Sequence, residues 1–258
     1  MMLEIIRRLP DRPTGRPPIL CIHGAYHGAW CWDEHFLPYF AERGYEAIAL
    51  SLRGHGDSAG RDRIAQWKLR DYLDDVLHVA ATLPEPPIVM GHSLGGALAL
   101  LFLEQHEAAA AVLLAPAAVG YMRRDALRWL VRHPWASMTS FLTRDMRRLL
   151  PTFRPHFFSP QTPTAVVEHY LGKMQEESYH VLTDQARLKL PSLRRSDTPI
   201  LLVHATYDSI PRRQHEAIAR HYGATLVTTP LGHEIMLEPE WRTVADAISE
   251  WLSEKFPV

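Results

Sequence analysis

Cysteine is scarce in this sequence, because the 258 residues contain only Cys21 and Cys31. Two cysteines are too few for the disulfide framework of a small secreted protein. Cys21 lies inside the apolar run of residues 19–22, where a buried thiol packs well. We therefore expect two free thiols and a reducing compartment, and we predict a cytoplasmic protein.

Long apolar runs are missing too, and so is an excess of charge of one sign. No stretch of about 18 apolar residues is present, which argues against a transmembrane helix. The first eight residues include Glu4 and lack the apolar centre of a signal peptide. A formal net charge of -1 argues against a general nucleic-acid binder. We predict a globular protein without a nucleic-acid partner or stable membrane association, of unknown oligomeric state.

Short apolar runs alternate with helical patterns along most of the chain. The runs are apolar on consecutive residues, as is typical of strands covered on both faces. The segments between them carry apolar residues at spacings of three and four, as amphipathic helices do. This alternation predicts the α/β class, with a mostly parallel central sheet and helices on both faces. The predicted strands are residues 19–22, 47–50, 88–90, 112–115, 200–203 and 225–227, and the predicted helices are 36–43, 70–82, 94–106, 212–222 and 244–251.

Residues 120–195 interrupt this alternation. They show no strand pattern, their helical pattern is broken by prolines, and they contain thirteen basic against six acidic residues. An insertion between two parallel strands lies over the carboxyl end of the sheet, where open α/β sheets bind ligands. We predict a helical cap, or lid, of residues 120–195 on a core of residues 1–119 and 196–258.

The sharpest motif is Gly91-His92-Ser93-Leu94-Gly95. It follows a predicted strand and opens a predicted helix, which is the context that a G-x-S-x-G nucleophile elbow requires. The glycines leave room for a strained turn that exposes the serine. The amide of Leu94, at the helix N-terminus, can stabilise a developing negative charge. We predict that Ser93 is a nucleophile and that Leu94 is an oxyanion donor.

A serine hydroxyl needs a base that takes its proton. With this elbow, an acid and then a histidine are expected later in the chain. Asp208 follows one predicted strand, and His233 lies between the last predicted strand and the last helix. Two other histidines of this region, His215 and His221, lie within one amphipathic helix and are predicted to be surface residues. We predict that Asp208 and His233 complete a catalytic triad.

The loop after the first apolar run is rich in small and aromatic residues. Gly24 lets the backbone approach a substrate, and the amide of Ala25 is the predicted second oxyanion donor. His23 is expected to hold the loop rather than to act in catalysis. Tyr26 and His27 of this loop, with His92 of the elbow, are predicted to contact the substrate.

Motifs for cofactors and metals are incomplete in this sequence. Gly54-His55-Gly56 lacks the third glycine of a dinucleotide loop, and no phosphate-binding P-loop occurs. The segments that begin at His215 and His233 each lack the second histidine of a zinc-binding helix. We therefore expect no cofactor and no metal.

Together these motifs resemble the successive signatures of the α/β-hydrolase superfamily. The resemblance rests on His23-Gly24, residues 53–58, the elbow, residues 208–211 and Gly232-His233, and it implies the α/β-hydrolase fold. Residues 23–30 also resemble the plant methylesterase and hydroxynitrile-lyase branch. The lyases of that branch have a threonine soon after the first histidine and a lysine after the catalytic one. This sequence has Gly24 and Glu234 at those positions, so the resemblance favours an esterase.

The predicted function is that of a serine hydrolase that cleaves carboxylic esters, as carboxylesterases and lipases do. A lactonase, thioesterase or amide hydrolase would use the same triad. A cofactor-free lyase or oxygenase, and a ligand receptor with a retained triad, also stay open.

Apolar cap residues predict a small-molecule substrate with an apolar acyl or aromatic part, and the arginines beside them either solvate the outer face or form a cationic rim. These apolar residues are Leu127, Trp129, Leu130, Trp135, Met138, Phe141, Leu142, Phe157 and Phe158.

Overall fold

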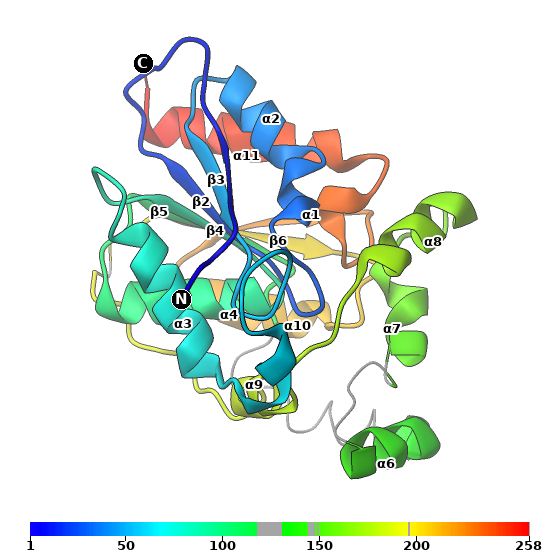
Figure 1. Cartoon of the computed structure of the whole chain (residues 1–258). Helices are drawn as coiled ribbons and strands as arrows, with labels where there is room; N and C mark the ends of the chain where they lie inside the picture. The colour runs from blue at the N-terminus through cyan, green and yellow to red at the C-terminus, as the bar shows by residue number, and fades with distance from the viewer. Residues whose placement is uncertain (118–130, 144–147, 149, 196, 258) are drawn as a thin grey trace.

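A seven-stranded sheet forms the centre of the molecule in the computed structural model (Figure 1). The structure describes residues 1–117, 131–143, 148, 150–195 and 197–257. The strand order is β1-β3-β2-β4-β5-β6-β7; β2 to β7 run parallel, and β1 pairs with β3 antiparallel at one edge. The strands are β1 (Ile5–Arg8), β2 (Ile19–Ile22), β3 (Ala47–Leu50), β4 (Ile88–His92), β5 (Ala110–Leu114), β6 (Ile200–Ala205) and β7 (Thr225–Thr229).

The six strands predicted from apolar runs are all present. The sequence pattern did not indicate β1, which is four residues long and mostly exposed at the sheet edge. An edge strand of this kind buries too little to leave a clear apolar signal. Its pairing with β3 therefore emerges only in the folded chain.

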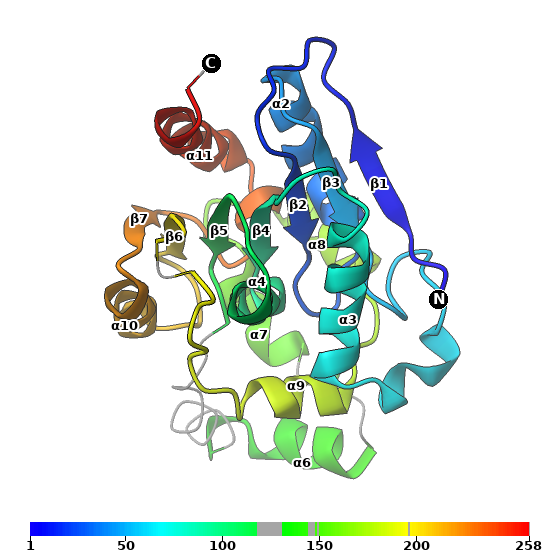
Figure 2. The same cartoon turned by 90° about the vertical axis from the view of Figure 1, so that its left-hand side faces the viewer.

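Helices cover both faces of the sheet (Figure 2). One face packs on α1 (Trp30–Asp33), α2 (Phe36–Glu42) and α11 (Trp241–Lys255), and the other on α3 (Leu69–Ala80), α4 (Leu94–Gln105) and α10 (Arg212–Tyr222). In β2, Ile19 and Cys21 enter the first core, whereas Leu20 and Ile22 enter the second. This two-sided burial explains why the strands are apolar on consecutive residues. The described residues also form the 3-10 helices η1 (Arg61–Gln66), which is mostly exposed, and η3 (Ile235–Leu237), whose residues belong to the first core.

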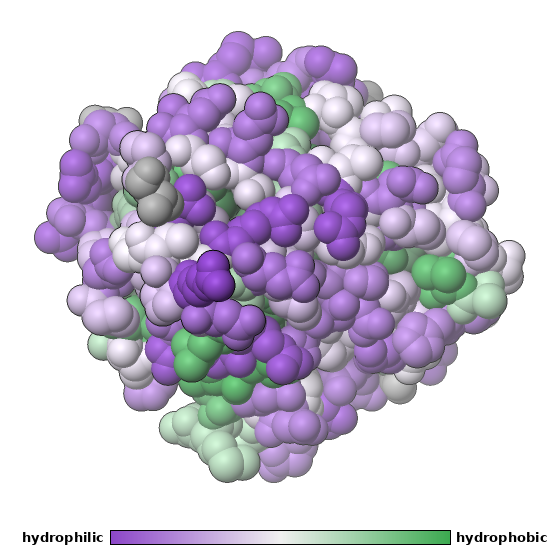
Figure 3. All heavy atoms as spheres, turned by 90° about the horizontal axis from the view of Figure 1, so that it is seen from above, coloured by the Kyte–Doolittle hydropathy of each residue, from purple (hydrophilic) through white to green (hydrophobic). Residues whose placement is uncertain are grey.

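The outer surface follows the amphipathic pattern of the helices. The side of the molecule that carries α2 and α11 is mostly hydrophilic, with a few small hydrophobic areas (Figure 3). Cys21 and Cys31 are both free and buried. Among the described residues, no helix is long and apolar enough to span a membrane.

Four helices lie between β5 and β6 in the described part of residues 120–195. They are α6 (Pro134–Thr143), α7 (Leu150–Phe157), α8 (Thr164–Lys173) and α9 (Tyr179–Gln185). We call residues 131–195 the inserted segment. Its described residues are helical or irregular, as the sequence pattern predicted. The expected boundary between residues 119 and 120 lies outside the described residues.

The order of the strands reverses between β2 and β4. From β2 the chain adds β3 on one side and then crosses to β4 on the other. In the register of this pair, Ile22 lies opposite Gly91. The loops after β2 and β4 therefore meet at the carboxyl edge of the sheet, at a topological switch point where α/β proteins bind ligands.

Candidate active site

Ser93 occupies a strained turn between β4 and α4. Its φ of 50° and ψ of -113° place a non-glycine residue at positive φ. A Cβ atom on Gly91 would lie 2.3 Å from the carbonyl oxygen of Gly95, and one on Gly95 would lie 2.1 Å from that of Ile22. Both glycines are therefore required by space, as the elbow motif predicts.

Residues 23–27, which we call the oxyanion loop, pass beside Ser93. A Cβ atom on Gly24 would lie 3.2 Å from the Cβ of Ser93 and 2.7 Å from His92 Nδ1. Only glycine lets the backbone come this close to the elbow. The loop of Ala25 is thus brought to the elbow that opens α4 at Leu94, while the role of these two amides as oxyanion donors stays a prediction.

The peptide between Gly24 and Ala25 is oriented by His23. The Nδ1–H of His23 donates to the carbonyl oxygen of Gly24 at 2.8 Å, while its Nε2 accepts from the amide of Leu52 at 3.0 Å. Burial lowers the pKa of His23 well below its ordinary value, so the ring is neutral. Because this carbonyl shares a peptide with the Ala25 amide, the bond sets the direction of the predicted donor. His23 thus has the structural contacts that the sequence suggested.

Asp208 and His233 come together from the ends of β6 and β7. His233 Nδ1 lies 3.0 Å from Asp208 Oδ2, and the side chain of Asp208 is fully buried. Burial alone would lower the pKa of His233, but the charge and hydrogen bond of Asp208 outweigh it and raise this pKa to about 9. The pairing occupies Nδ1 and fixes the ring so that Nε2 is the nitrogen available for proton transfer.

One histidine prediction is wrong. His215 is buried rather than at the surface, because α10 turns Gln214, His215 and Ile218 toward the sheet. Its Nε2–H donates to the carbonyl oxygen of Pro116 at 2.9 Å, and its Nδ1 lies 2.9 Å from His204 Nδ1. The helical pattern showed an amphipathic helix, but not that this histidine belongs to the buried face. His221 is exposed, as predicted.

A second buried carboxylate lies next to His233. Glu234 Oε2 is 3.2 Å from His27 Nε2 and 4.0 Å from His92 Nε2, and all three side chains are at most 2% exposed. Burial would raise the pKa of Glu234, but the two histidines lower it to about 2. The sequence indicated His27 and His92 but gave Glu234 no role, although an acid directly before the apolar residues 235–237 was an available signal.

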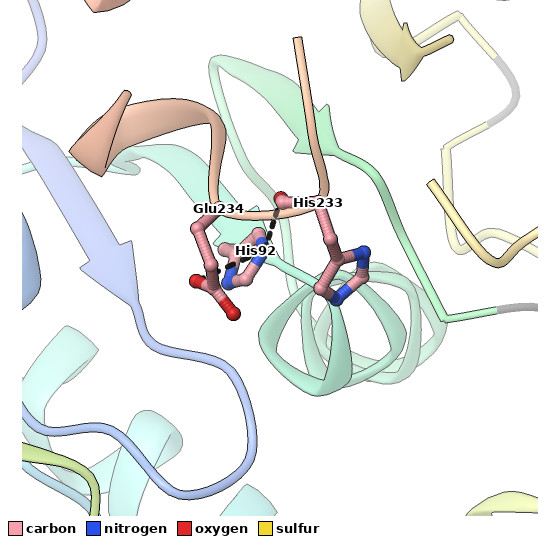
Figure 4. Close-up of side chains that lie close together, drawn as sticks. All are labelled: His92, His233 and Glu234. Atoms are coloured by element: carbon pink, nitrogen blue, oxygen red, sulfur yellow. Dashed lines mark hydrogen bonds and ion pairs between the residues drawn. The ribbon is translucent and has the colours of Figure 1, made fainter. Parts of the chain in front are cut away.

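His92 is neutral and bonded to the backbone. Burial lowers its pKa to about 3. Its Nε2–H donates to the carbonyl oxygen of His233 at 2.9 Å, and Figure 4 shows this bond beside the contact with Glu234. The elbow and the loop of the candidate base are therefore joined through the residue before Ser93. Contact of His92 with a substrate stays a prediction.

The same residues could be considered as metal ligands. His92, His233 and Glu234 each offer a ligand atom, and these atoms lie within 4.8 Å of one another. However, His92 Nε2 already donates to a carbonyl, and His233 Nδ1 is paired with Asp208. We interpret the cluster as a network of ion pairs and hydrogen bonds.

The inserted segment is hydrogen-bonded to the loop of His233. The amides of His233 and Glu234 donate to the carbonyl oxygens of His156 (3.1 Å) and Phe157 (2.8 Å). The Phe157 ring stacks on the His233 ring with centroids 6.2 Å apart. Glu238, which is fully buried, accepts hydrogen bonds from the amide of Gly232 at 2.7 Å and from Ser159 and Thr162 of the inserted segment.

The inserted segment also reaches the oxyanion loop. Glu177 is buried and accepts hydrogen bonds from the Tyr26 amide at 3.4 Å and the Tyr72 hydroxyl at 2.7 Å, and it lies 3.3 Å from His55 Nε2. The carbonyl of Tyr26 accepts from the amide of Gln175 at 2.8 Å. Tyr26 has a φ of 69°, so these bonds hold a residue in an unfavourable conformation. No motif in the sequence marked Glu177 or Glu238.

The apolar residues predicted for a substrate pocket fall into two groups. Phe157 and Phe158 are buried, whereas Trp135, Met138 and Leu142 are exposed on α6. These three α6 side chains therefore do not pack on the core. Leu127, Trp129, Leu130 and the side chain of Phe141 lie outside the described residues.

The profile of a family described as the alpha/beta hydrolase family matches residues 19–247. The chain belongs to this family. It is 30% identical over 215 residues to the AB hydrolase superfamily protein YisY of Bacillus subtilis, covering 78% of this chain and 77% of that protein.

One further relative of this alpha/beta hydrolase and one solved structure of similar fold carry names that mention esters. Methylesterase 3 of Arabidopsis thaliana is 31% identical over 80 residues, which is 30% of each chain. The structure of an esterase from Exiguobacterium antarcticum superposes with a TM-score of 0.73 at 18% identity, covering 97% of this hydrolase and 95% of that chain. At this identity the superposition shows the shared fold.

Proposed function

We propose that this chain is a serine hydrolase that cleaves carboxylic esters through an acyl-enzyme. Ser93 is the nucleophile, His233 the general base and Asp208 the acid that orients the histidine. The observation that carries the proposal is the strained turn of Ser93 at the topological switch point, together with the buried pair of Asp208 and His233 on neighbouring strand ends. The esterase and methylesterase names of relatives support ester bonds as the target.

In the proposed mechanism, Ser93 Oγ attacks the ester carbonyl while His233 Nε2 takes its proton. The amides of Ala25 and Leu94 stabilise the resulting oxyanion. Collapse of the tetrahedral intermediate breaks the bond to the alkoxy group, which leaves as the alcohol with the proton from His233. Water, deprotonated by the same histidine, then attacks the acyl-enzyme and releases the carboxylic acid and free Ser93.

We infer that residues 120–195 form a cap over a core of residues 1–119 and 196–258. The backbone bonds of His156 and Phe157 to the His233 loop support a position at the carboxyl edge of the sheet. Phe157 beside His233 supports a substrate with an apolar acyl or aromatic part. Two buried free thiols fit the cytoplasmic location expected from the sequence.

The covalent step is tested by labelling with a fluorophosphonate, which reacts with activated serines. We expect wild-type protein to be labelled and Ser93→Ala not to be labelled. For a p-nitrophenyl ester, kcat should fall by at least about a thousandfold in that variant, because one missing triad member removes the covalent route. Ser192→Ala, at an exposed serine, is the matched control and should behave as wild type. Near wild-type turnover by Ser93→Ala would refute the mechanism.

Substrate class is tested with p-nitrophenyl esters from acetate to octanoate, beside lactones, thioesters and amides. We expect kcat/KM to rise with acyl length, since each buried methylene contributes somewhat under about 1 kcal/mol until the pocket is full. A flat or falling series argues against an apolar acyl pocket. A higher kcat/KM for a lactone, thioester or amide would indicate a lactonase, thioesterase or amide hydrolase instead. Labelling of Ser93 without turnover of any substrate would favour a ligand receptor. Anionic esters that lose kcat/KM as salt rises would support a cationic rim.

A further inference from the structure

The oxyanion loop is held at two consecutive peptides by buried side chains. His23 bonds the carbonyl of Gly24, as described above. The next carbonyl, that of Ala25, accepts from His27 Nδ1–H at 2.8 Å. Nδ1 of His27 therefore carries a proton. The ring is positively charged if Nε2, which faces Glu234, carries a proton as well, and neutral if it does not.

His27 and Glu234 form a buried ion pair. Burial alone would lower the pKa of His27, but the charge of Glu234 raises it above the ordinary value. The opposite shift at Glu234 agrees with this assignment, so the imidazolium and the carboxylate are the paired forms. The Trp30 ring stacks on His27 with centroids 5.4 Å apart, which favours a positive charge.

We propose that the His27–Glu234 pair is a positioning device that locks the oxyanion loop to the loop of the catalytic base, and this inference rests on the proposed function. His27 donates a hydrogen bond to the carbonyl oxygen of Ala25, and Glu234 follows His233 directly in the chain. The two loops that must act together on one substrate carbonyl are thereby fixed relative to each other. A shift of the Ala25 amide by a fraction of an ångström would weaken oxyanion stabilisation, which depends on preorganised donors.

The pair also acts on the base through its charge. The negative charge of Glu234 raises the pKa of His233. Among the described residues, Asp208, His27, His92 and His215 also interact electrostatically with His233. Loss of the Glu234 charge therefore lowers the pKa of His233, which a merely structural substitution elsewhere would not do.

The central test is Glu234→Gln, which keeps the shape and removes the charge. Rates are referred to active sites titrated with the fluorophosphonate, so partial unfolding does not imitate a slower enzyme. We expect kcat to fall about ten- to a hundredfold, less than the loss on removing an oxyanion donor, with KM changed much less. The acid limb of the kcat/KM profile should move to lower pH. Glu85→Gln, at an exposed acid, is the matched control.

Two substitutions of His27 separate its contacts. His27→Asn can donate to the Ala25 carbonyl but does not reach Glu234, whereas His27→Gln can reach Glu234 but lacks the Nδ1 donor. If catalysis depends on His27 joining the Ala25 carbonyl to Glu234, both substitutions lower kcat. The double variant His27→Gln with Glu234→Gln should then lose less kcat than the product of the two single losses. Wild-type kcat in His27→Asn, or wild-type kcat and pH profile in Glu234→Gln, would overturn the inference. If the wild type is not labelled at Ser93, the proposed function itself fails.

Discussion

Two parts of the inserted segment, helix α6 and residues 156–178, differ in how they relate to the core. Helix α6 exposes Trp135 by 73% and Leu142 by 71%, and its ten residues include no ionisable side chain. Residues 156–178, by contrast, bond to the His233 loop through His156 and to the oxyanion loop through Glu177. The α6 part thus presents apolar surface to solvent, whereas residues 156–178 are tied to both loops of the candidate site by hydrogen bonds.

The difference shows which part of the inserted segment is anchored to the loops of the candidate site. A buried carboxylate that satisfies several donors specifies one arrangement, because leaving any of those donors unpaired is costly. Glu177 and Glu238 supply this kind of constraint. The exposed apolar side chains of α6 make no such hydrogen bonds and do not fix one arrangement. We therefore expect substitutions in the anchored part to affect stability and catalysis, and substitutions on α6 to affect neither strongly.

The largest effect is expected for Glu238→Gln. This change places an amide among four donors, including the backbone amides of Ser159 and Gly232. We expect a loss of about 3 kcal/mol in the free energy of unfolding, since a hydrogen bond to a charged group contributes about 1.5–3 kcal/mol. Urea unfolding measures it, with the exposed Glu240→Gln as the matched control. Equal unfolding midpoints for the two variants would contradict the anchoring role.

A somewhat smaller effect is expected for Gly232→Ala. Its Cβ would lie 2.5 Å from the backbone Cα and carbonyl carbon of Phe158, so the His233 loop and the inserted segment must move apart. Overpacking of this kind costs about 1–3 kcal/mol, and kcat should fall with it. Gly172→Ala is the matched control, because it lies in α8 with open space around it, and helix propensity favours alanine. Unchanged kcat in Gly232→Ala would show that the loop tolerates the shift.

The pH dependence of stability should differ between variants at the His233–Asp208 pair and variants on α6. The pKa of His233 is raised from 6.5 to about 9. The stability from its pair with Asp208 is therefore fully present below pH 6.5 and is lost as pH rises through about 9. Over the same range kcat/KM should rise, because only the neutral imidazole acts as base.

Urea unfolding of wild type and Asp208→Asn at several pH values checks the stability part. The difference between them should be largest below pH 6.5 and should shrink above pH 9. Trp135→Ser on α6 should differ from wild type by the same amount at every pH. A wild-type to Asp208→Asn difference that grows with pH would refute the assigned direction of the pKa shift.

The smallest effect is expected for α6. Trp135→Ser and Leu142→Ser should each change the free energy of unfolding by less than about 0.5 kcal/mol, because exposed substitutions without special contacts rarely do more. The ester rates should also stay near those of wild type. A loss of more than about 1 kcal/mol in either variant would show that this face packs against something in solution, such as a second copy of the chain.

Local sequence signals predicted the elements that depend on neighbouring residues. The elbow around Ser93 was recognisable because its glycines are required within five residues of one another. The strands were recognisable because burial on both faces makes them continuously apolar. His215 shows the limit of such signals: an amphipathic pattern predicts a helix but does not say whether a polar residue of that helix lies on its buried face.

The sequence by itself determined the α/β alternation, the elbow at Ser93 and the order of Asp208 and His233 along the chain. Each of these follows from short-range spacing or from a fixed chain order. Only the tertiary structure decided which buried acid meets which loop. Glu177 bonds to Tyr26 across 151 positions, and Glu238 reaches Ser159 across 79. No periodicity links residues so far apart, because their contact depends on how strands and inserted helices come together in space.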